Sequence, residues 1–373
     1  MEETKKENKI LNFFIKTLNG MAYGLFATLI IGTIFGTIGT LFAKGENDFC
    51  QFMANIFSST SGLAYVLQML TGAGIGVGIA LALKFDPLKT VVLAAVGETA
   101  SYCSLSTKAI TAGTIFEEFP VGKFQIGDPL TVYLVCISVA LIMQLVLRKK
   151  TPVDILIVPL FGGVVGLALS LLIRYPAIYV TYGIQWIVDE GTTFVPFLMG
   201  IVVAVLMGMA LTAPISSAAI AAMIFTGAAA GSGLAIASGA AIVGCSAQMV
   251  GFAIQSRKDN NIGMVISVGI GTSMLQFKNI LKKPIIWLPT IIASAILGPI
   301  STCLLKLSCL GSSAGMGTAG LVGQIGTFAT MGNTWQTWVG IFVLEIIAPA
   351  ALVFGLDLLF RKLGWIKEGD LKI

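Results

Sequence analysis

Long apolar runs, separated by short polar or basic segments, follow one another along most of the chain. Several of them reach the roughly 20 residues that a helix needs to cross the hydrocarbon core of a bilayer. The pattern therefore predicts an all-α, polytopic helical membrane protein with about ten transmembrane helices. The clearest spans are expected at residues 21–42, 62–83, 129–147, 155–173, 194–211, 234–254, 287–305 and 335–360.

Other apolar stretches are too short or too interrupted to span in the ordinary way. Residues 48–60 carry Phe and Met at helical spacing and predict a helix at the membrane interface, and residues 177–191 form a second short amphipathic stretch. The run that begins at residue 88 meets Glu98 after about ten residues, which predicts a short or broken helix and a partly re-entrant connection. Residues 262–275 contain two glycines and lie between basic residues, which predicts a re-entrant hairpin or a short tilted span.

The most irregular stretch is GSSAGMGTAGLVGQIGTFATMGN, residues 311–333. It has closely spaced glycines and no charge, so neither a spanning helix nor a solvated loop suits it. Irregular backbone at membrane depth is tolerated only where protein or a water-filled cavity surrounds it. In transporters such segments often line the binding site. We therefore expect this stretch to enter from the outer side and to form a gate or half of a site.

Composition agrees with a membrane protein and excludes several function classes. The chain is 56% hydrophobic and 11% charged, with a mean hydropathy of +0.93, against about 25% charged residues in soluble domains. Histidine is absent, which excludes histidine metal sites, histidine proton relays and a phosphohistidine on this chain. The six cysteines show no CxxC pair and are interpreted as buried small hydrophobes. No nucleotide-binding loop or catalytic arrangement is present, so we expect no cofactor, no metal and no catalytic centre.

Basic residues gather between the spans, and they predict the topology. The net charge of +5 reflects this loop bias, and no basic patch with interleaved aromatic residues points to nucleic acid. Because basic loops stay in the cytoplasm, both termini are predicted to be cytoplasmic in a multi-pass protein of a bacterial cell membrane. Residues 1–20 are interpreted as a cytoplasmic tail and not a signal peptide, and residues 361–373 as a second tail.

Two pairs of segments indicate an internal repeat. KKTPVDILIVPLFGG from Lys149 resembles KKPIIWLPTIIASA from Lys282, and KFDP at Lys84 resembles LTAP at Leu211, with nearly the same offset. We predict a membrane domain over residues 21–360, with repeats at about 21–150 and 153–283 and a partial third unit at 285–360. The alternative is that helices rich in Gly, Ala and Leu resemble one another in any case.

Two carboxylates lie deep in apolar runs. An ionisable group there costs several kcal/mol unless it pairs, binds a ligand or is protonated. Glu98 is the leading candidate for substrate or proton binding, and its alternative is a structural pair, for instance with Lys108. Glu345 could likewise be protonated or bond a neighbouring helix. Both are candidates for proton or ion coupling.

Uncharged polar residues beside glycines supply further candidates. Gln248, Ser246 and Gln324 have neighbouring glycines that let backbone approach a hydroxyl-rich ligand, and the amides offer donors and an acceptor. The alternative for each is an interhelical hydrogen bond. The candidate substrate-binding residues are Glu98, Thr99, Ser101, Ser246, Gln248, Thr318, Gln324 and Thr327.

The segments GETASYCSLSTKAIT, GSGLAIASGAAIVGCSAQMVGFAIQS and GMGTAGLVGQIGTF, together with the layout of the chain, resemble the PTS EIIC type 2, or perfringolysin O regulator (PfoR), family of membrane proteins. The resemblance covers nearly the whole chain. It implies a IIC component that carries sugar while separate IIA and IIB proteins deliver the phosphoryl group. Better known IIC proteins are homodimers with a membrane Glu, and often a His, at the sugar; this chain has Glu98 and Glu345 but no His.

Three functions follow from these features. The first is a IIC-type transporter of a sugar or other small hydroxylated solute in the lipid bilayer, with Glu98, Gln248 and Gln324 lining the site and any phosphotransfer performed by IIA and IIB. The second is an ion-coupled secondary transporter in which Glu98 or Glu345 takes up the proton. The third is a membrane sensor that regulates gene expression through a partner, consistent with the regulator label of the family.

Overall fold

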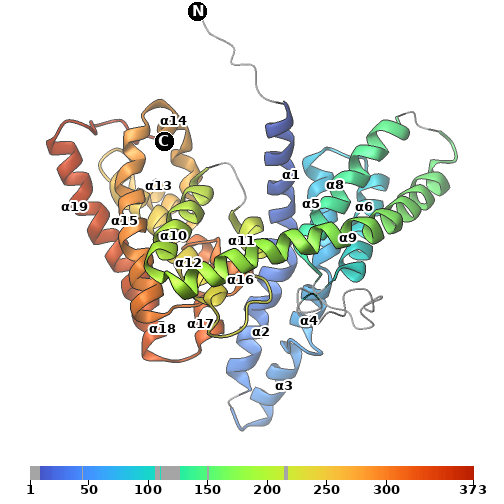
Figure 1. The fold of residues 1–373 in the computed structure, drawn as a ribbon, viewed down its shortest axis with the longest axis horizontal. Coiled ribbons are helices and arrows are strands. Elements are labelled where there is room, and N and C mark those ends of the chain that lie inside the picture. The colour runs from blue at the N-terminus through green and yellow to red at the C-terminus, as the bar shows by residue number, and fades with distance from the viewer. Residues whose placement is uncertain (1–8, 44, 106–109, 111–126, 149–150, 214–216) are drawn as a thin grey trace, which may run out of the picture. The chain divides into compact units, whose positions relative to one another are not determined.

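The structure is a computed structural model that describes residues 9–43, 45–105, 110, 127–148, 151–213 and 217–373 (Figure 1). These residues form helices and no strands. Six helices are long and apolar enough to cross a membrane, or up to eight if each of two bent helix pairs is one span. The predicted all-α polytopic class is confirmed. The described parts hold fewer membrane-length helices than the ten predicted, in part because the span expected at residues 194–211 forms a helix of only 17 residues, α10 (Pro196–Thr212).

The chain divides into two compact units, Met1–Tyr182 and Gly183–Ile373. The predicted repeat boundaries remain a prediction. In the first unit the helices are α1 (Lys9–Leu25), η1 (Phe26–Ile30), α2 (Ile31–Phe42), α3 (Asp48–Ile56), α4 (Leu63–Met69), α5 (Thr71–Ala82), α6 (Pro87–Cys103) and α8 (Pro129–Val146), and α9 (Asp154–Phe194) begins there.

Helix α5 holds the first unit together through glycines on two opposite faces. Gly74 and Gly78 pack on α1, where a Cβ added at Gly78 would overlap the Gly20 carbonyl oxygen. Gly72 and Gly76 lie two residues away from them, about 200° around the helix, and pack on α6 instead. Small residues at i and i+4 let membrane helices approach backbone to backbone. The alternating glycines of α5 therefore place it between α1 and α6.

One sequence prediction about this part of the chain is wrong. We expected a span at residues 155–173 and a separate amphipathic stretch at 177–191, but α9 is one continuous helix of 41 residues. Its interior Pro176 removes only one helical hydrogen bond, which membrane helices tolerate. Arg174 does not end the helix either, because its side chain is buried and Nη2 donates to the Tyr175 hydroxyl at 2.7 Å.

The predicted interfacial helix at residues 48–60 is present as α3. The Asn47 side chain caps it by accepting a hydrogen bond from the Cys50 N–H at 2.8 Å. None of its residues is buried, and Phe49 and Phe52 are exposed. Such exposed aromatic residues suit a helix that lies at a lipid interface, which remains a prediction.

The second unit is built around the long helix α12, almost all of whose residues are buried. Glycines again set the packing: Gly244 of α12 lies against Ala204 of α10, and Gly298 of α15 lies against Gly200 of α10. The helices are α10 (Pro196–Thr212), α11 (Ser217–Phe225), α12 (Gly233–Ser256), α13 (Ile262–Ile266), η2 (Ser267–Gly271), η3 (Ser273–Gln276), α14 (Phe277–Lys282), η4 (Pro284–Trp287), α15 (Leu288–Pro299), η5 (Ile300–Leu305), α16 (Gly311–Ala314), η6 (Ala319–Leu321), α17 (Val322–Met331), α18 (Trp335–Val339), η7 (Gly340–Ile347) and α19 (Ala348–Lys362).

The segment predicted as a re-entrant hairpin is sharply bent. Ile262–Gly271 and Ser273–Lys282 meet at an angle of 119°. The break falls at Thr272, whose extended backbone interrupts the helix directly after Gly271. The pair therefore has the broken geometry that the glycines predict.

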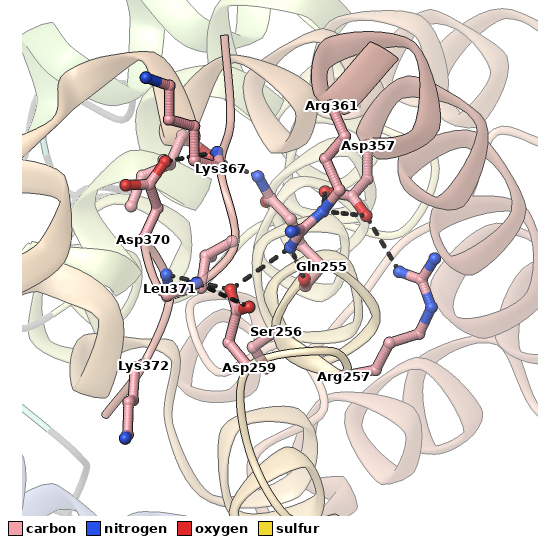
Figure 2. A network of polar contacts seen from close by, with 12 residues as sticks. Gln255, Ser256, Arg257, Asp259, Asp357, Arg361, Lys367, Asp370, Leu371 and Lys372 are labelled. Atoms are coloured by element: carbon pink, nitrogen blue, oxygen red, sulfur yellow. Dashed lines mark hydrogen bonds and ion pairs between the residues drawn. The ribbon is translucent and has the colours of Figure 1, made fainter. Parts of the chain in front are cut away.

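The end of α12, the second arm of this bent pair and the last residues of the chain meet in one polar network (Figure 2). Arg361 donates from Nε to both carboxylate oxygens of the fully buried Asp357, at 3.0 and 3.1 Å, and lies 3.4 Å from Asp259 Oδ2. Asp259 in turn accepts hydrogen bonds from the backbone N–H groups of Gly369 and Leu371. The network brings together basic residues from three segments of the chain, Arg257, Lys283 and Arg361. The topology prediction placed all three in the cytoplasm, and that side remains a prediction.

Candidate functional site

The glycine-rich stretch at residues 311–333 is folded into the second unit as a discontinuous helix. α16 and α17 are short helices separated by a turn in which Gly317, Gly320 and Leu321 all have positive φ. Most residues from Ser312 to Thr327 are buried. This confirms that the irregular backbone is protected by protein.

The turn packs directly on one face of α12. A Cβ added at Gly317 would lie 2.8 Å from the Cys245 carbonyl carbon and 3.1 Å from the Ser246 nitrogen. Glycine is required here for two reasons, since φ is +57° and no side chain fits. Two turns earlier on α12, Ser238 accepts from the Cys309 N–H at 2.9 Å and donates to the Cys309 carbonyl at 2.8 Å.

Thr318 joins the turn to the bent helix pair. Its hydroxyl donates to the Gly269 carbonyl oxygen in η2 at 2.5 Å. Gly269 lies in a π-helical segment, where backbone carbonyls are freed from regular pairing. Two broken elements of the second unit, the turn and the bent pair, therefore touch through a predicted site residue.

Glu345 is at the centre of a second polar cluster. It lies on the π-helix η7, and it is fully buried. Its Oε2 accepts from Gln324 Nε2 at 2.7 Å, and its Oε1 accepts from the Thr327 hydroxyl at 2.9 Å. Among the described residues no ion pair involves Glu345. Three residues predicted separately from the sequence are thus in direct contact.

Three predicted site residues carry buried polar atoms that have no hydrogen-bond partner among the described residues: Ser246 Oγ, Gln324 Oε1 and, on another face of α12, Gln248 Nε2. Ser246 is fully buried and Gln324 is 7% exposed. Buried polar groups are nearly always satisfied, and each exception calls for an explanation. A ligand hydroxyl can donate to either oxygen, and it can also accept from the Ser246 hydroxyl.

Gln248 lies on the other side of α12 from Ser246, because two residues correspond to about 200° of helical rotation. Its Oε1 accepts from Trp287 Nε1 at 2.9 Å, from the Thr290 hydroxyl at 2.9 Å and from Thr212 at 3.3 Å. Its Nε2 is buried without a partner. Gln248 therefore connects α10, α12 and the segment leading into α15. This is the interhelical hydrogen bond that the sequence analysis gave as the alternative for this residue. Its role in substrate binding remains a prediction.

The candidates of the first unit form a separate group on α6. Glu98 is half-buried, and its Oε2 accepts from the Ala73 N–H at 3.0 Å. Ala73 is in the first turn of α5, next to a 52° bend between α4 and α5. The free N–H groups of a helix start stabilise a carboxylate, so Glu98 has a structural partner within its unit. The alternative partner, Lys108, is outside the described residues.

Thr99 and Ser101 make local contacts. The Thr99 hydroxyl donates to the Ala95 carbonyl one turn earlier, at 2.8 Å. Ser101 accepts from the Gly127 N–H at 3.0 Å and so fixes the start of the segment before α8. Their roles in solute binding remain predictions.

Sequence reasoning missed Ser238 and Cys309, which lie beside the predicted cluster. Ser238 stands eight residues before Ser246, a spacing that places both near one face of a helix. That spacing was a usable signal. Cys309 Sγ contacts the Gly323 carbonyl at 3.6 Å, and nothing in an isolated cysteine predicts this.

The sequence of the chain matches a known protein family. A sequence model of the family described as "Phosphotransferase system, EIIC" matches residues 15–373. No curated protein matches the chain. The family match agrees with the membrane-length helices and with the resemblance seen in the sequence.

Proposed function

Because the chain belongs to the phosphotransferase system EIIC family, a family of multi-pass plasma membrane transporters of small molecules, we propose that it carries a sugar or another small hydroxylated solute. The proposed contacts in the second unit are Ser246, Thr318, Gln324 and Thr327. In the first unit Glu98, Thr99 and Ser101 are proposed separately, and Gln248 remains a candidate on the far face of α12.

The observation that carries the proposal is the pair of buried, unpartnered oxygens, Ser246 Oγ and Gln324 Oε1. They belong to α12 and α17, and the turn that precedes α17 packs on the α12 backbone at Cys245 and Ser246 through Gly317. Sugar hydroxyls donate and accept hydrogen bonds at once, and they match such oxygens. Burial of these oxygens without a hydrogen-bond partner costs free energy, so a solute that donates hydrogen bonds to them stabilises the protein.

The proposal is tested by uptake of labelled sugars into proteoliposomes that contain the purified protein. Ser246→Ala removes an atom that has no hydrogen-bond partner in the described part of the chain, so we expect the thermal midpoint to stay equal or to rise. Loss of one hydrogen bond to the solute costs about 1 kcal/mol, so the apparent affinity should fall about fivefold to tenfold. Unchanged uptake of a proven substrate would remove Ser246 from the site.

Ser267→Ala is the matched control, because its hydroxyl is exposed and donates only to Gly263. Glu98→Gln tests the first unit independently with the same assay. If uptake by Glu98→Gln equals that of the wild type, Glu98 only supports the start of α5.

An ion-coupled transporter is the second candidate, and Glu345 favours it. A buried carboxylate with two neutral donors and no ion pair among the described residues can take up a proton or a monovalent cation during transport. In this case a protonophore would abolish uptake, and phosphoenolpyruvate with IIA and IIB proteins would have no effect. The reverse result would favour phosphotransfer by partners.

The family supplies the remaining proposals. We propose that separate IIA and IIB proteins act with this chain, that it forms a homodimer, and that both termini are cytoplasmic. The regulator function linked with the perfringolysin O regulator name is an alternative. A stable transcriptional partner recovered with the purified protein would support it.

A further inference from the structure

A basic pocket lies in the first unit, and none of the candidate site residues lines it. Its volume is about 320 Å³, within the range of small-molecule pockets, about 300–1,000 Å³. Both apolar and charged side chains line it. The lining residues are Leu83, Lys84, Phe85, Asp86, Lys89, Gln144, Leu147 and Arg148.

The pocket lies where helices of the first unit end. α5 ends at Ala82, α6 begins at Pro87 and α8 ends at Val146. α8 has the length and the hydropathy of a membrane span, so its end marks the boundary between hydrocarbon and water. Lipid headgroups occupy this boundary.

The charges of the pocket are not balanced. Asp86 Oδ1 accepts from the Lys89 N–H at 3.1 Å, and its other oxygen lies 3.7 Å from Lys89 Nζ. Lys89 Nζ also donates to the Leu147 carbonyl at 2.9 Å, so both groups are engaged locally. In the described part of the chain, Lys84 and Arg148 form no ion pair. They provide the positive excess that faces a ligand.

The backbone of Lys84 is an independent observation. Lys84 has φ +58°, and it closes α5 with two hydrogen bonds, Lys84 N–H to Leu81 and Phe85 N–H to Ala80. This is a helix stop at which glycine is the usual residue, because other residues are strained there. Backbone strain of this kind clusters at functional sites.

We propose that this pocket binds the phosphate group of an anionic phospholipid. Lys84 and Arg148 contact the phosphate oxygens through charge-assisted hydrogen bonds. The apolar side chains of Leu83, Phe85 and Leu147 contact the glycerol and the first methylenes. Basic pockets between membrane helices are known sites for anionic headgroups.

Native mass spectrometry of the full-length protein, purified in detergent with equal amounts of phosphatidylglycerol and phosphatidylcholine, tests this. We expect the wild type to retain phosphatidylglycerol preferentially. Lys84→Gly and Arg148→Gln should each reduce the preference about fivefold, the factor that corresponds to about 1 kcal/mol per basic residue near an anionic surface. Lys84→Gly also relieves the backbone strain, so its thermal midpoint should stay equal or rise.

The matched control is Lys282→Gln, which removes the same charge from an exposed position of the second unit and should leave the preference unchanged. The proposal would be overturned if the wild type retained both lipids equally, or if Lys84→Gly kept the full preference for phosphatidylglycerol. Displacement of the lipid by inorganic phosphate would overturn it in favour of a soluble anion. If Lys84→Gly and Arg148→Gln kept the lipid preference but lost phosphoenolpyruvate-dependent uptake, the lipid proposal would be overturned and the pocket would be assigned to a phosphorylated protein partner.

Discussion

The buried carboxylate of Glu345 depends on two polar residues of the second unit. The Thr327 hydroxyl and the Gln324 amide satisfy one carboxylate oxygen each. The sequence identified all three residues as polar groups inside apolar runs. It could not show that they meet, because Glu345 and Gln324 lie on different helices whose packing depends on the glycine turn between α16 and α17.

We expect Thr327→Val to destabilise the protein by about 1–3 kcal/mol, because it leaves a buried carboxylate oxygen without a donor. Thr330→Val is the matched control: its hydroxyl donates to the Gly326 carbonyl of its own helix and is only partly buried. Thermal unfolding of both variants in the same detergent measures the difference. Equal midpoints for the two variants would mean that the Thr327 hydroxyl contributes little to stability.

The ion pair between Lys283 and Asp370 makes stability depend on pH. Partial burial raises the pKa of Asp370, but the hydrogen bond from Lys283 at 2.5 Å, the Lys367 N–H and the charges of both lysines outweigh it, so the pKa lies below its usual 3.8. A lowered folded pKa contributes stability that is present above the unfolded pKa and is lost as the pH falls through the folded pKa.

Compared with Asp370→Asn, the wild type should therefore be more stable by about 0.5–1 kcal/mol at neutral pH. This advantage should shrink as the pH falls below about 4. Thermal unfolding of both proteins across this range is the measurement. A difference that is independent of pH would show that the ionised carboxylate is not responsible.

Helix-level packing was partly readable from the sequence. The alternating glycines of α5 indicate two close contacts, but they do not name the partner helices, since many apolar helices compete for the same role. Conversely, Pro176 reads as a helix end, whereas α9 continues through it. Local signals are overridden here because a long apolar helix has no other way to satisfy its backbone in a membrane.

Gly78→Ala should destabilise the protein by about 1–3 kcal/mol, because the added Cβ overlaps the Gly20 carbonyl oxygen and α1 must shift. Gly163→Ala on α9 is the control, since an added Cβ there meets nothing within 4 Å. That variant should be neutral or gain up to about 1 kcal/mol from helix propensity. The thermal midpoint should fall for Gly78→Ala and stay equal or rise for Gly163→Ala; a similar fall in both would mean that the close contact at Gly78 is not responsible.

At the scale of the whole molecule, the sequence predicted the all-α membrane class, the long spans and the protected glycine stretch. These features follow from hydropathy and glycine spacing, which can be read from neighbouring residues. The lower number of membrane-length helices did not, since the 17 residues of α10 belong to an apolar run that composition does not separate from a full span. Topology is open to direct test. The network in Figure 2 joins Asp259 to the last residues of the chain, and Lys283 forms an ion pair with Asp370 there, so these residues must lie on one side of the membrane.

The helix from Trp335 to Lys362 has the length of a span, which places Asn333 on the opposite side from that network. We expect single cysteines at Lys258 and Lys367 to react with an impermeant maleimide only from the cytoplasmic face, and a cysteine at Asn333 only from the outer face. Cys50 and Cys303 are first replaced by Ser, because the other four native cysteines are buried. Labelling of Lys258→Cys and Lys367→Cys from opposite faces would contradict the network, whereas labelling of both from outside would reverse the orientation while leaving the fold intact. The two results are distinguishable because Asn333→Cys must then react from the cytoplasmic face.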